Sequence, residues 1–492
     1  MKTFIKNNLA TILTYAIFLI GVTFCCLSRF SYNIFFSVFI YPTCFLIFSR
    51  KTNAKIGLPL IYCGLVIGWG VGLSNALESP IIDIGVSFAI AIVYLIPFLV
   101  DKLVVCNFFK TSKWLQPLMF ALLWVTIDVI ISFQPFGNIS SIAYSLCQVL
   151  HLCGILSLFG LNFLTLIIIY FDACIADFIE NRKIKKLVPC IVALSFASVY
   201  GGIYGMYPTT NTLNKVKVMT TICPEITPDK PLSYEETEDA LLSCVNRAHS
   251  NSINANILAT AEECFYIKES KRDSFKTFCL NNCTFDDLCV IIGVRLIQDN
   301  NEQKFRNEAW IFGKGLHNKP NNEVYFYTYV KVHPVPGAES GMIIGDGTIP
   351  LVDTPFGKIS VVICLDLEFE HYVSTVGRNG ADILIAPSWD WDTVPTNHSL
   401  TNAFRAVENG VNFIRPVKCG YSIATDYKGN IISQFYTGNI SQQEDHVFYI
   451  PTKGIFTLYP YLSFFIDYLY PVAYLTILGY CIYSRNKNKA KS

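Results

Sequence analysis

The stretch GKISVVICLDLE, at residues 357–368, gives the strongest local indication of the fold. The apolar, mostly β-branched run from Ile359 to Ile363 is typical of a buried strand. Cys364 ends this run, and we expect a turn into a helix after it. A thiol in that place can act as a nucleophile, because N–H groups at a helix start favour the thiolate and lower its pKa. A buried structural cysteine explains the local pattern equally well.

Two earlier segments place other reactive groups at strand ends. In ATAEEC, at residues 259–264, Glu262 and Glu263 follow the apolar pair Ile257-Leu258, although a solvated surface glutamate is the simpler explanation of this segment alone. In YTYVKVHPVPGAES, at residues 327–340, Lys331 ends an aromatic-rich strand before Pro and Gly break it. A buried lysine can stabilise an oxyanion, but an edge-strand lysine is an ordinary alternative. We expect His333 to pack or hydrogen-bond rather than catalyse.

Several other kinds of site are disfavoured. Residues 210–458 contain neither a GxSxG nucleophile elbow nor an HExxH zinc helix. Cys279, Cys283 and Cys289 have the spacing C-x3-C-x5-C, which is not a zinc pattern, although a disulfide among them is possible. We therefore expect no metal and no cofactor. The net charge of +1 gives no electrostatic case for binding nucleic acid.

The composition indicates a membrane protein. Of the 492 residues, 52% are hydrophobic and 15% are charged, whereas soluble proteins have about 25% charged residues. A spanning helix needs about 20 apolar residues. Segments close to this length run over 9–28, 32–49, 56–75, 80–100, 114–134, 150–172, 187–207 and 461–483. We therefore predict a transmembrane domain of seven helices over 1–209, a soluble domain over 210–458, and a C-terminal helix with a basic tail over 459–492.

Loop charge predicts the orientation. Lys and Arg gather in the N-terminal residues, in the loops at 50–55, 101–113 and 180–186, and in the tail, while the loops at 76–79 and 135–149 have none. Because basic loops stay in the cytoplasm, eight spans place both ends there and the soluble domain outside. A count that is wrong by one helix would reverse this orientation.

The order of Glu262, Lys331 and Cys364 resembles the catalytic triad of the carbon-nitrogen hydrolase (nitrilase) superfamily, in which each residue stands at a strand end. The resemblance continues through His398, the stretch Arg405–Gly410 (RAVENG), Arg415, and then Gly420-Tyr-Ser422, Asp426 and Gly429. It implies an α/β nitrilase-like domain, an αββα sandwich, behind the helical membrane domain.

Within this superfamily, the apolipoprotein N-acyltransferase branch is the most similar, because it joins membrane helices to an outward-facing nitrilase-like domain and one C-terminal helix. The segment Lys331–Glu339 (KVHPVPGAE) looks like that branch's K.HLVPFGE motif, and Phe136-Gly-Asn matches its membrane part. Departures include AEE at 261–263 in place of PET, which makes Glu263 a rival to Glu262. CLD at 364–366 replaces CYE.

The resemblance implies an acyltransferase of the cell (inner) membrane whose catalytic domain is extracytoplasmic. A phospholipid would donate an acyl chain to Cys364 as a thioester, and the α-amino group of a diacylated apolipoprotein would accept it. Glu262 would be the base, with Lys331 and the Leu365 N–H stabilising the oxyanion, and Glu339 and Asp366 supporting the site. A membrane-tethered amidase and a non-catalytic membrane binding protein are the alternatives.

Overall fold

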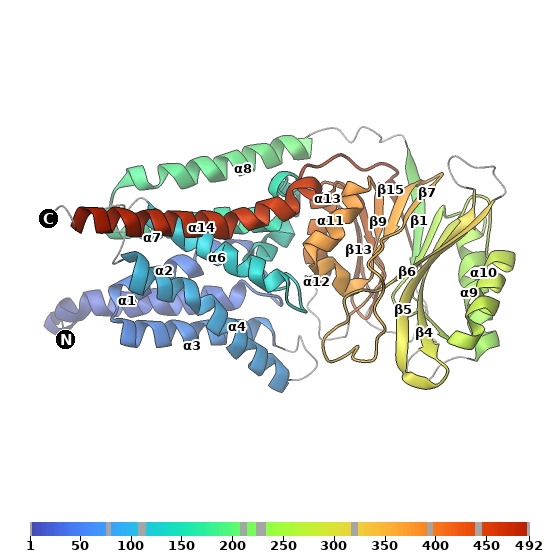
Figure 1. The fold of residues 1–492 in the computed structure, drawn as a ribbon, viewed down its shortest axis with the longest axis horizontal. Coiled ribbons are helices and arrows are strands. Elements are labelled where there is room, and N and C mark those ends of the chain that lie inside the picture. The colour runs from blue at the N-terminus through green and yellow to red at the C-terminus, as the bar shows by residue number, and fades with distance from the viewer. Residues whose placement is uncertain are drawn as a thin grey trace.

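The computed structural model describes residues 2–74, 80–106, 115–206, 214–222, 233–315, 323–390, 397–437 and 445–489. Apolar helices form a bundle at one end of the molecule, and a layered sandwich of sheets and helices forms the other end (Figure 1). This arrangement confirms the expected fold class, a multi-span helical domain joined to a nitrilase-like α/β domain. The start of α1 and the end of α14 both lie at the end of the bundle away from the sandwich (Figure 1).

Six of the described helices are long and apolar enough to cross a membrane. These stretches are Leu9–Leu27 within α1 (Lys2–Leu27), α3 (Ala54–Gly72), Pro80–Val105 across α4 (Pro80–Val100) and η2 (Asp101–Val105), α7 (Leu156–Asn181), α8 (Val188–Met206), and Tyr459–Ser484 within α14 (Tyr459–Lys489). A shorter apolar helix, α6 (Gln116–Ser132), has 17 residues and packs against α7 and α14. The predicted total of eight spans stays a prediction.

The segment expected to span over 32–49 differs from that expectation. It forms the 3-10 helix η1 (Phe35–Phe39) and the 11-residue helix α2 (Tyr41–Lys51). An 11-residue helix is about 16 Å long, about half the thickness of the hydrocarbon core. Asn33 has a left-handed backbone and Pro42 lies in the first turn of α2, so the chain turns before the helix begins.

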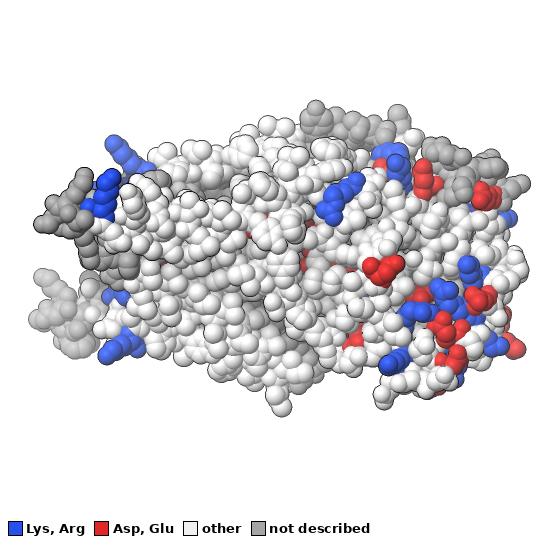
Figure 2. Space-filling view, viewed as in Figure 1, with Lys and Arg blue, Asp and Glu red and all other residues white. Residues whose placement is uncertain are grey.

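The surface charge follows the same division. On the face shown in Figure 2, Lys, Arg, Asp and Glu gather over the sandwich, a few basic residues lie at the opposite end, and the wide zone between them is nearly free of charge. Such a zone suits a lipid environment, where an exposed charge is costly. The structure therefore supports a membrane location.

The sandwich contains two larger sheets, and the described residues place seven strands in one and six in the other. The first sheet has the order β15-β1-β2-β4-β5-β6, with β3 also paired to β4. Its strands are β1 (Lys215–Thr221), β2 (Ile257–Thr260), β3 (Phe265–Lys268), β4 (Cys289–Gln298), β5 (Asn301–Lys314), β6 (Val324–Val330) and β15 (Asp445–Pro451).

The second sheet has the order β14-β13-β11-β9-β8-β7. Its strands are β7 (Leu351–Thr354), β8 (Gly357–Val361), β9 (Ile383–Ile385), β11 (Asn412–Arg415), β13 (Tyr421–Thr425) and β14 (Ile431–Tyr436). A separate parallel pair is formed by β10 (Ser388–Trp389) and β12 (Val417–Lys418), which follow β9 and β11 in the sequence.

The inner strands β2, β4 and β9 are buried on both faces along most or all of their length, which explains their continuous apolar runs. In β2, Ile257 and Ala259 face the core between the sheets, while Leu258 faces the helices α9 (Tyr234–His249) and α10 (Arg272–Asn282). On the other side, α11 (Glu370–Arg378) and α13 (Phe404–Asn409) cover the second sheet and pack on α14 and α7. The sandwich is therefore fastened to the membrane helices through its own helical layer.

A break in α7 contributes to this junction. Gly160 has a left-handed backbone (φ +72°), and the ring of Tyr459, at the start of α14, packs against its Cα. Because the break frees the Leu161 N–H from the helix, that group can donate a hydrogen bond to Glu408 Oε1 of α13, at 3.0 Å. One glycine thus allows two membrane helices and the sandwich to meet.

We predict that Gly160→Ala lowers stability by roughly 2 to 4 kcal/mol, because the new Cβ would lie 2.1 Å from the Tyr459 ring on a strained backbone. Gly479→Ala in α14 is the matched control, since a Cβ there meets nothing within 4 Å. Thermal unfolding in detergent should show a lower Tm for Gly160→Ala only. Equal Tm values for the two variants would contradict this account of the junction.

Candidate active site

Glu262 lies just beyond the end of β2, which pairs with β1 and β4 in the middle of the first sheet. Its side chain is buried, and its Oε1 accepts hydrogen bonds from Lys331 Nζ at 2.8 Å and Asn307 Nδ2 at 2.6 Å. Two donors on one oxygen fix the direction of the carboxylate. The end of a central strand therefore presents a carboxylate inside the protein.

Lys331 directly follows β6 and is also buried. Its Nζ donates to Glu262 and to both oxygens of Glu339, at 3.0 and 2.8 Å. Glu339 is held in turn by the Val335 N–H at 2.6 Å. The ammonium thus lies between two carboxylates, and the structure brings together three of the residues that the sequence indicated.

Burial raises the pKa of Glu262, and the positive charge of Lys331 opposes this rise. Burial alone would lower the pKa of Lys331, but the negative charges of Glu262, Cys364 and Glu339 together outweigh burial and raise that pKa. Lys331 is therefore a permanent cation beside a carboxylate of increased basicity. This pairing suits a general base next to an oxyanion stabiliser.

Cys364 follows β8 and begins the five-residue 3-10 helix η7 (Cys364–Glu368). It is buried, its N–H donates to the Pro387 carbonyl at 3.0 Å, and its sulfur lies 3.9 Å from the Trp389 carbonyl. Its φ of +46° is left-handed, which is uncommon for a residue with a side chain. Backbone strain of this kind concentrates at functional sites.

The expectation of a lowered thiol pKa was wrong. Burial and the negative charge of Glu262 raise the pKa of Cys364, while Lys331 and Arg415 oppose the rise. A 3-10 turn of five residues supplies too little aligned backbone to outweigh desolvation. The thiol is therefore protonated at rest and needs a base, and Glu262 lies close enough to influence its charge.

Asp366 connects the turn at Cys364 to the loop after β6. Its Oδ2 accepts from the Ile363 N–H at 3.1 Å and the Tyr329 hydroxyl at 2.6 Å. Its Oδ1 contacts His333 through the backbone N–H at 2.9 Å and Nδ1 at 2.8 Å, as expected for a hydrogen-bonding histidine. Leu365, between Cys364 and Asp366, is buried in the same turn.

The structure distinguishes Glu262 from its neighbour Glu263. The Glu263 backbone is left-handed (φ +48°), and its Oε2 pairs with Arg295 Nη1 at 2.8 Å. Of these two adjacent glutamates, Glu262 is the one that hydrogen-bonds Lys331. The geometry therefore favours Glu262 over Glu263 as the carboxylate that serves Cys364.

Sequence reasoning missed two parts of the site. Asn307, a buried amide in β5, hydrogen-bonds both Glu262 and Glu339, and its only signal was a polar residue beside an apolar strand segment. Asp390 forms a two-point ion pair with Arg415, at 2.8 and 3.0 Å, and also contacts His398 Nδ1 at 3.1 Å. Asp390 directly follows Trp389, so its ion pair with Arg415 fixes the backbone next to the Trp389 carbonyl. That carbonyl oxygen is the one that lies 3.9 Å from the Cys364 sulfur.

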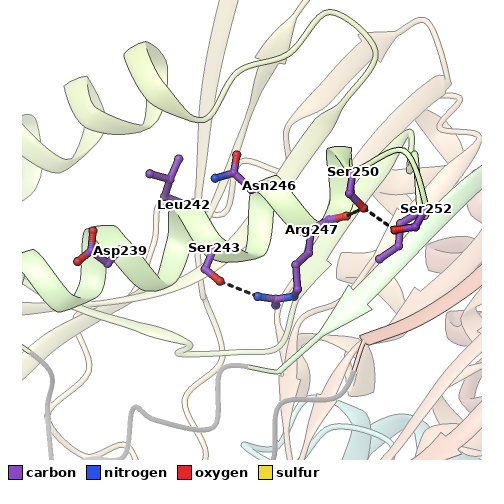
Figure 3. Close-up of a pocket in the computed structure, with 8 residues that line it drawn as sticks. Asp239, Leu242, Ser243, Asn246, Arg247, Ser250 and Ser252 are labelled. Atoms are coloured by element: carbon purple, nitrogen blue, oxygen red, sulfur yellow. Dashed lines mark hydrogen bonds between the residues drawn. The ribbon is translucent and has the colours of Figure 1, made fainter.

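Two surface hollows lie outside this cluster. One, of about 680 Å³, runs along α9 beside Asp239, Ser243 and Arg247, and shares no lining residue with the cluster (Figure 3). The other, of about 630 Å³ and mainly apolar, lies between the end of α6 and the loop after β6, and Phe133, Pro334 and Phe369 are among its lining residues. Only the second borders the segments that carry Lys331 and Cys364.

Cys279, Cys283 and Cys289 are buried free thiols. The possible disulfide among them is therefore not formed in this structure. They pack in the region of α10 and β4 as small hydrophobic residues, as unreactive buried cysteines do.

This chain is similar to several known proteins. The sequence profile of the carbon-nitrogen hydrolase family matches residues 290–444, which include Lys331 and Cys364. The apolipoprotein N-acyltransferase of Rickettsia prowazekii is 26% identical over 421 residues, which cover 77% of this chain and 81% of that protein. The apolipoprotein N-acyltransferase of Geobacter metallireducens is 22% identical, over 63% of this chain and 64% of that protein.

Among solved structures, Saccharomyces cerevisiae Nit3, of the nitrilase superfamily, covers 51% of this chain and 94% of its own, with 18% identity and a TM-score of 0.38. The match of the family profile shows a carbon-nitrogen hydrolase domain, which this chain carries on a bundle of apolar helices. Along most of its length it is a homologue of the apolipoprotein N-acyltransferases, at about 25% identity.

The charge network at His398 predicts a pH-dependent stability. Burial favours a neutral imidazole, but the carboxylates of Asp390 and Glu368 together outweigh burial and raise the pKa of His398 from 6.5 to about 9. A raised pKa in the folded state gives stability that is complete below pH 6.5 and is lost as the pH rises through 9. We expect a loss on the order of 1 to 3 kcal/mol over this range.

Thermal unfolding at pH values from 6 to 10 measures this loss. His398→Gln should be less stable than the native protein at pH 6 and should show a flatter pH dependence. Parallel curves for the two proteins would show that His398 does not supply the effect.

Proposed function

We propose that the protein transfers an acyl chain from a phospholipid, through a thioester on Cys364, to the α-amino group of a lipid-modified N-terminal cysteine of a lipoprotein. The observation that carries this proposal is the buried contact of Lys331 with Glu262 beside Cys364. The similarity to apolipoprotein N-acyltransferases through the membrane helices as well as the sandwich adds support.

In the first step, Glu262 accepts the thiol proton and the Cys364 sulfur attacks the carbonyl carbon of the phospholipid ester. The charge that develops on the carbonyl oxygen is stabilised by Lys331 and the Leu365 N–H, a contribution typically worth about 3–4 kcal/mol per donor. The carbon–oxygen ester bond breaks, and the departing lysophospholipid oxygen takes the proton from Glu262. The acyl chain remains as a thioester.

In the second step, the α-amino group of the acceptor attacks the thioester carbonyl. Glu262 accepts a proton from the nitrogen, the carbon–sulfur bond breaks, and the Cys364 sulfur recovers the proton. The product is an amide, and the enzyme returns to its starting state. Lys331 stays protonated throughout, as its raised pKa requires.

The membrane helices are consistent with substrates that are anchored in lipid. Removing an acyl chain from a bilayer costs roughly 0.8 kcal/mol per CH₂ group, and a domain held at the membrane surface avoids that cost. The apolar hollow at Phe133 and Phe369 lies between the helix bundle and the catalytic loops, where a chain could enter. Basic loops and a basic tail support a cytoplasmic side opposite the sandwich, and hence an extracytoplasmic active site.

Cys364→Ala should abolish acyl-enzyme formation, because it removes the sulfur atom that the proposed first step acylates. The measurement is peptide mass spectrometry after incubation with a phospholipid that carries an isotope-labelled acyl chain. Cys283→Ala, which removes a buried thiol directly after α10, is the matched control and should keep the labelled thioester on Cys364.

A labelled thioester that persists in the Cys364→Ala protein would contradict the assignment of the nucleophile. Turnover of small amides by the native protein, without any acyl group from phospholipid, would instead support the membrane-tethered amidase.

The adjacent glutamates give a second, sharper test. Glu262→Gln removes the base and should slow acyl-enzyme formation by about 100-fold or more. Glu263→Gln loses only the contact with Arg295 and should keep most of the rate. Because burial raises the pKa of Glu262, protonation should switch off the native reaction at a pH above 4.5 as the pH falls, and both Glu263→Gln and the native protein should show this acid limb.

The pH profile of single-turnover acylation measures this limb. Equal loss of rate in the two variants, or a limb that persists in Glu262→Gln, would exclude Glu262 as the base.

A further inference from the structure

A second group of buried polar side chains lies where α11 meets α14 and α7. Glu370 begins α11, five residues after Leu365, and Asp467 lies in α14. Asn162, just past the break in α7, donates through Nδ2 to Glu370 Oε1 at 2.8 Å and to Asp467 Oδ1 at 3.0 Å. Both carboxylates are almost fully buried. Two distant segments thus place acidic oxygens around one point, a third supplies the amide that bridges them, and this point is separate from the Glu262 cluster.

The positive charge near this group is limited. Arg405 of α13 pairs with Glu408 at 2.9 Å and is 3.8 Å from Glu370 Oε2, which is too long for a hydrogen bond. His371 Nε2, 3.0 Å from Asp467 Oδ2, is the other cationic group in contact among the residues that the structure describes. The close counter-charge of Asp467 is therefore the His371 imidazole, while Glu370 has only the more distant Arg405 guanidinium, which pairs more tightly with Glu408. Burying two carboxylates is costly unless they are paired.

Several oxygens here also lack hydrogen-bond donors. Within the described part of the chain, Glu370 Oε2 and Asn162 Oδ1 are buried and have no well-aligned hydrogen-bond donor, and the contact of Asp467 Oδ2 is the one with His371 Nε2. The side-chain amide of Asn138 also lies close enough to interact with the Glu370 carboxylate. The hydroxyls of Tyr459 and Tyr470, both at least nine-tenths buried, have no hydrogen-bond partner there either, and both lie close enough to the two carboxylates to interact with their charge. Buried polar atoms normally have hydrogen-bond partners. A group of buried polar atoms without them therefore indicates a bound ligand.

We propose that Glu370, His371 and Asp467 bind one divalent cation of the Zn²⁺ or Mn²⁺ kind. One ligand atom from each of them lies within 4.8 Å of the others, so a small inward movement would bring all three within bonding distance of one ion. Two carboxylates and an imidazole are a donor set that such ions accept. This site departs from the sequence-based expectation of no metal, because its ligands lie about a hundred residues apart.

The bound cation would replace the proton shared between His371 and Asp467, so that a neutral imidazole faces the metal. It would also fasten the C-terminal membrane helix to the helix that directly follows the Cys364 turn. The ion lies outside the Glu262 cluster and is structural, so this proposal does not depend on the proposed acyl transfer.

The test begins with the full-length protein in detergent, stripped by a chelator and dialysed. Titration with ZnCl₂ or MnCl₂ should show one bound equivalent by elemental mass spectrometry and a rise in Tm, with a much smaller rise for MgCl₂. Asp467→Asn and His371→Gln should each weaken binding by about 10- to 100-fold or more.

Asp172→Asn is the matched control, because Asp172 is a buried carboxylate of α7 that accepts a hydrogen bond from Thr43 instead. It should bind the metal as the native protein does. If Asp467→Asn does not fold, His371→Gln, whose side chain is partly exposed, still decides the question. The proposal would be overturned if neither Zn²⁺ nor Mn²⁺ bound to the native protein in a one-to-one ratio. Equal metal affinity of His371→Gln and the native protein would also overturn it.

Discussion

The site depends on one buried ammonium held between two carboxylates. Lys331 can stay charged inside the sandwich only because Glu262 and Glu339 compensate for its desolvation, and each carboxylate depends on the ammonium in the same way. Asn307 completes the hydrogen bonding of both. This arrangement fixes a basic carboxylate and a cation next to a thiol that is protonated at rest, which is the combination that acyl transfer through a thioester needs.

The membrane helices form part of the support of this site. The Asn138 N–H, from the loop after α6, donates to the Glu368 carbonyl at 2.9 Å, and Glu368 ends the turn that Cys364 begins. The break at Gly160 lets α7 bind Glu408. A change in the bundle can therefore reach the nucleophile through a few packed residues, and the sandwich is expected to keep its geometry only on the intact membrane domain.

The sequence was informative where chemistry follows a strand. Lys331, Cys364 and the pair Glu262/Glu263 each follow an apolar run, so their places at strand ends were predictable, and so were the long apolar helices. The choice between the two glutamates needed the position of Arg295, and the thiol pKa needed its burial. The segment 32–49 was expected to form one long helix but forms two short ones, because length and hydropathy do not reveal the turn before α2. Asp467 carried no motif, since its partners come from other segments.

An experimental map of the protein in phospholipid nanodiscs would test the central claim most directly. The account predicts Lys331 Nζ within hydrogen-bonding distance of Glu262 and Glu339, with the Cys364 sulfur directed at that pair. A map in which Glu262 turns away from Lys331, or in which the Cys364 sulfur points away from both residues, would contradict it.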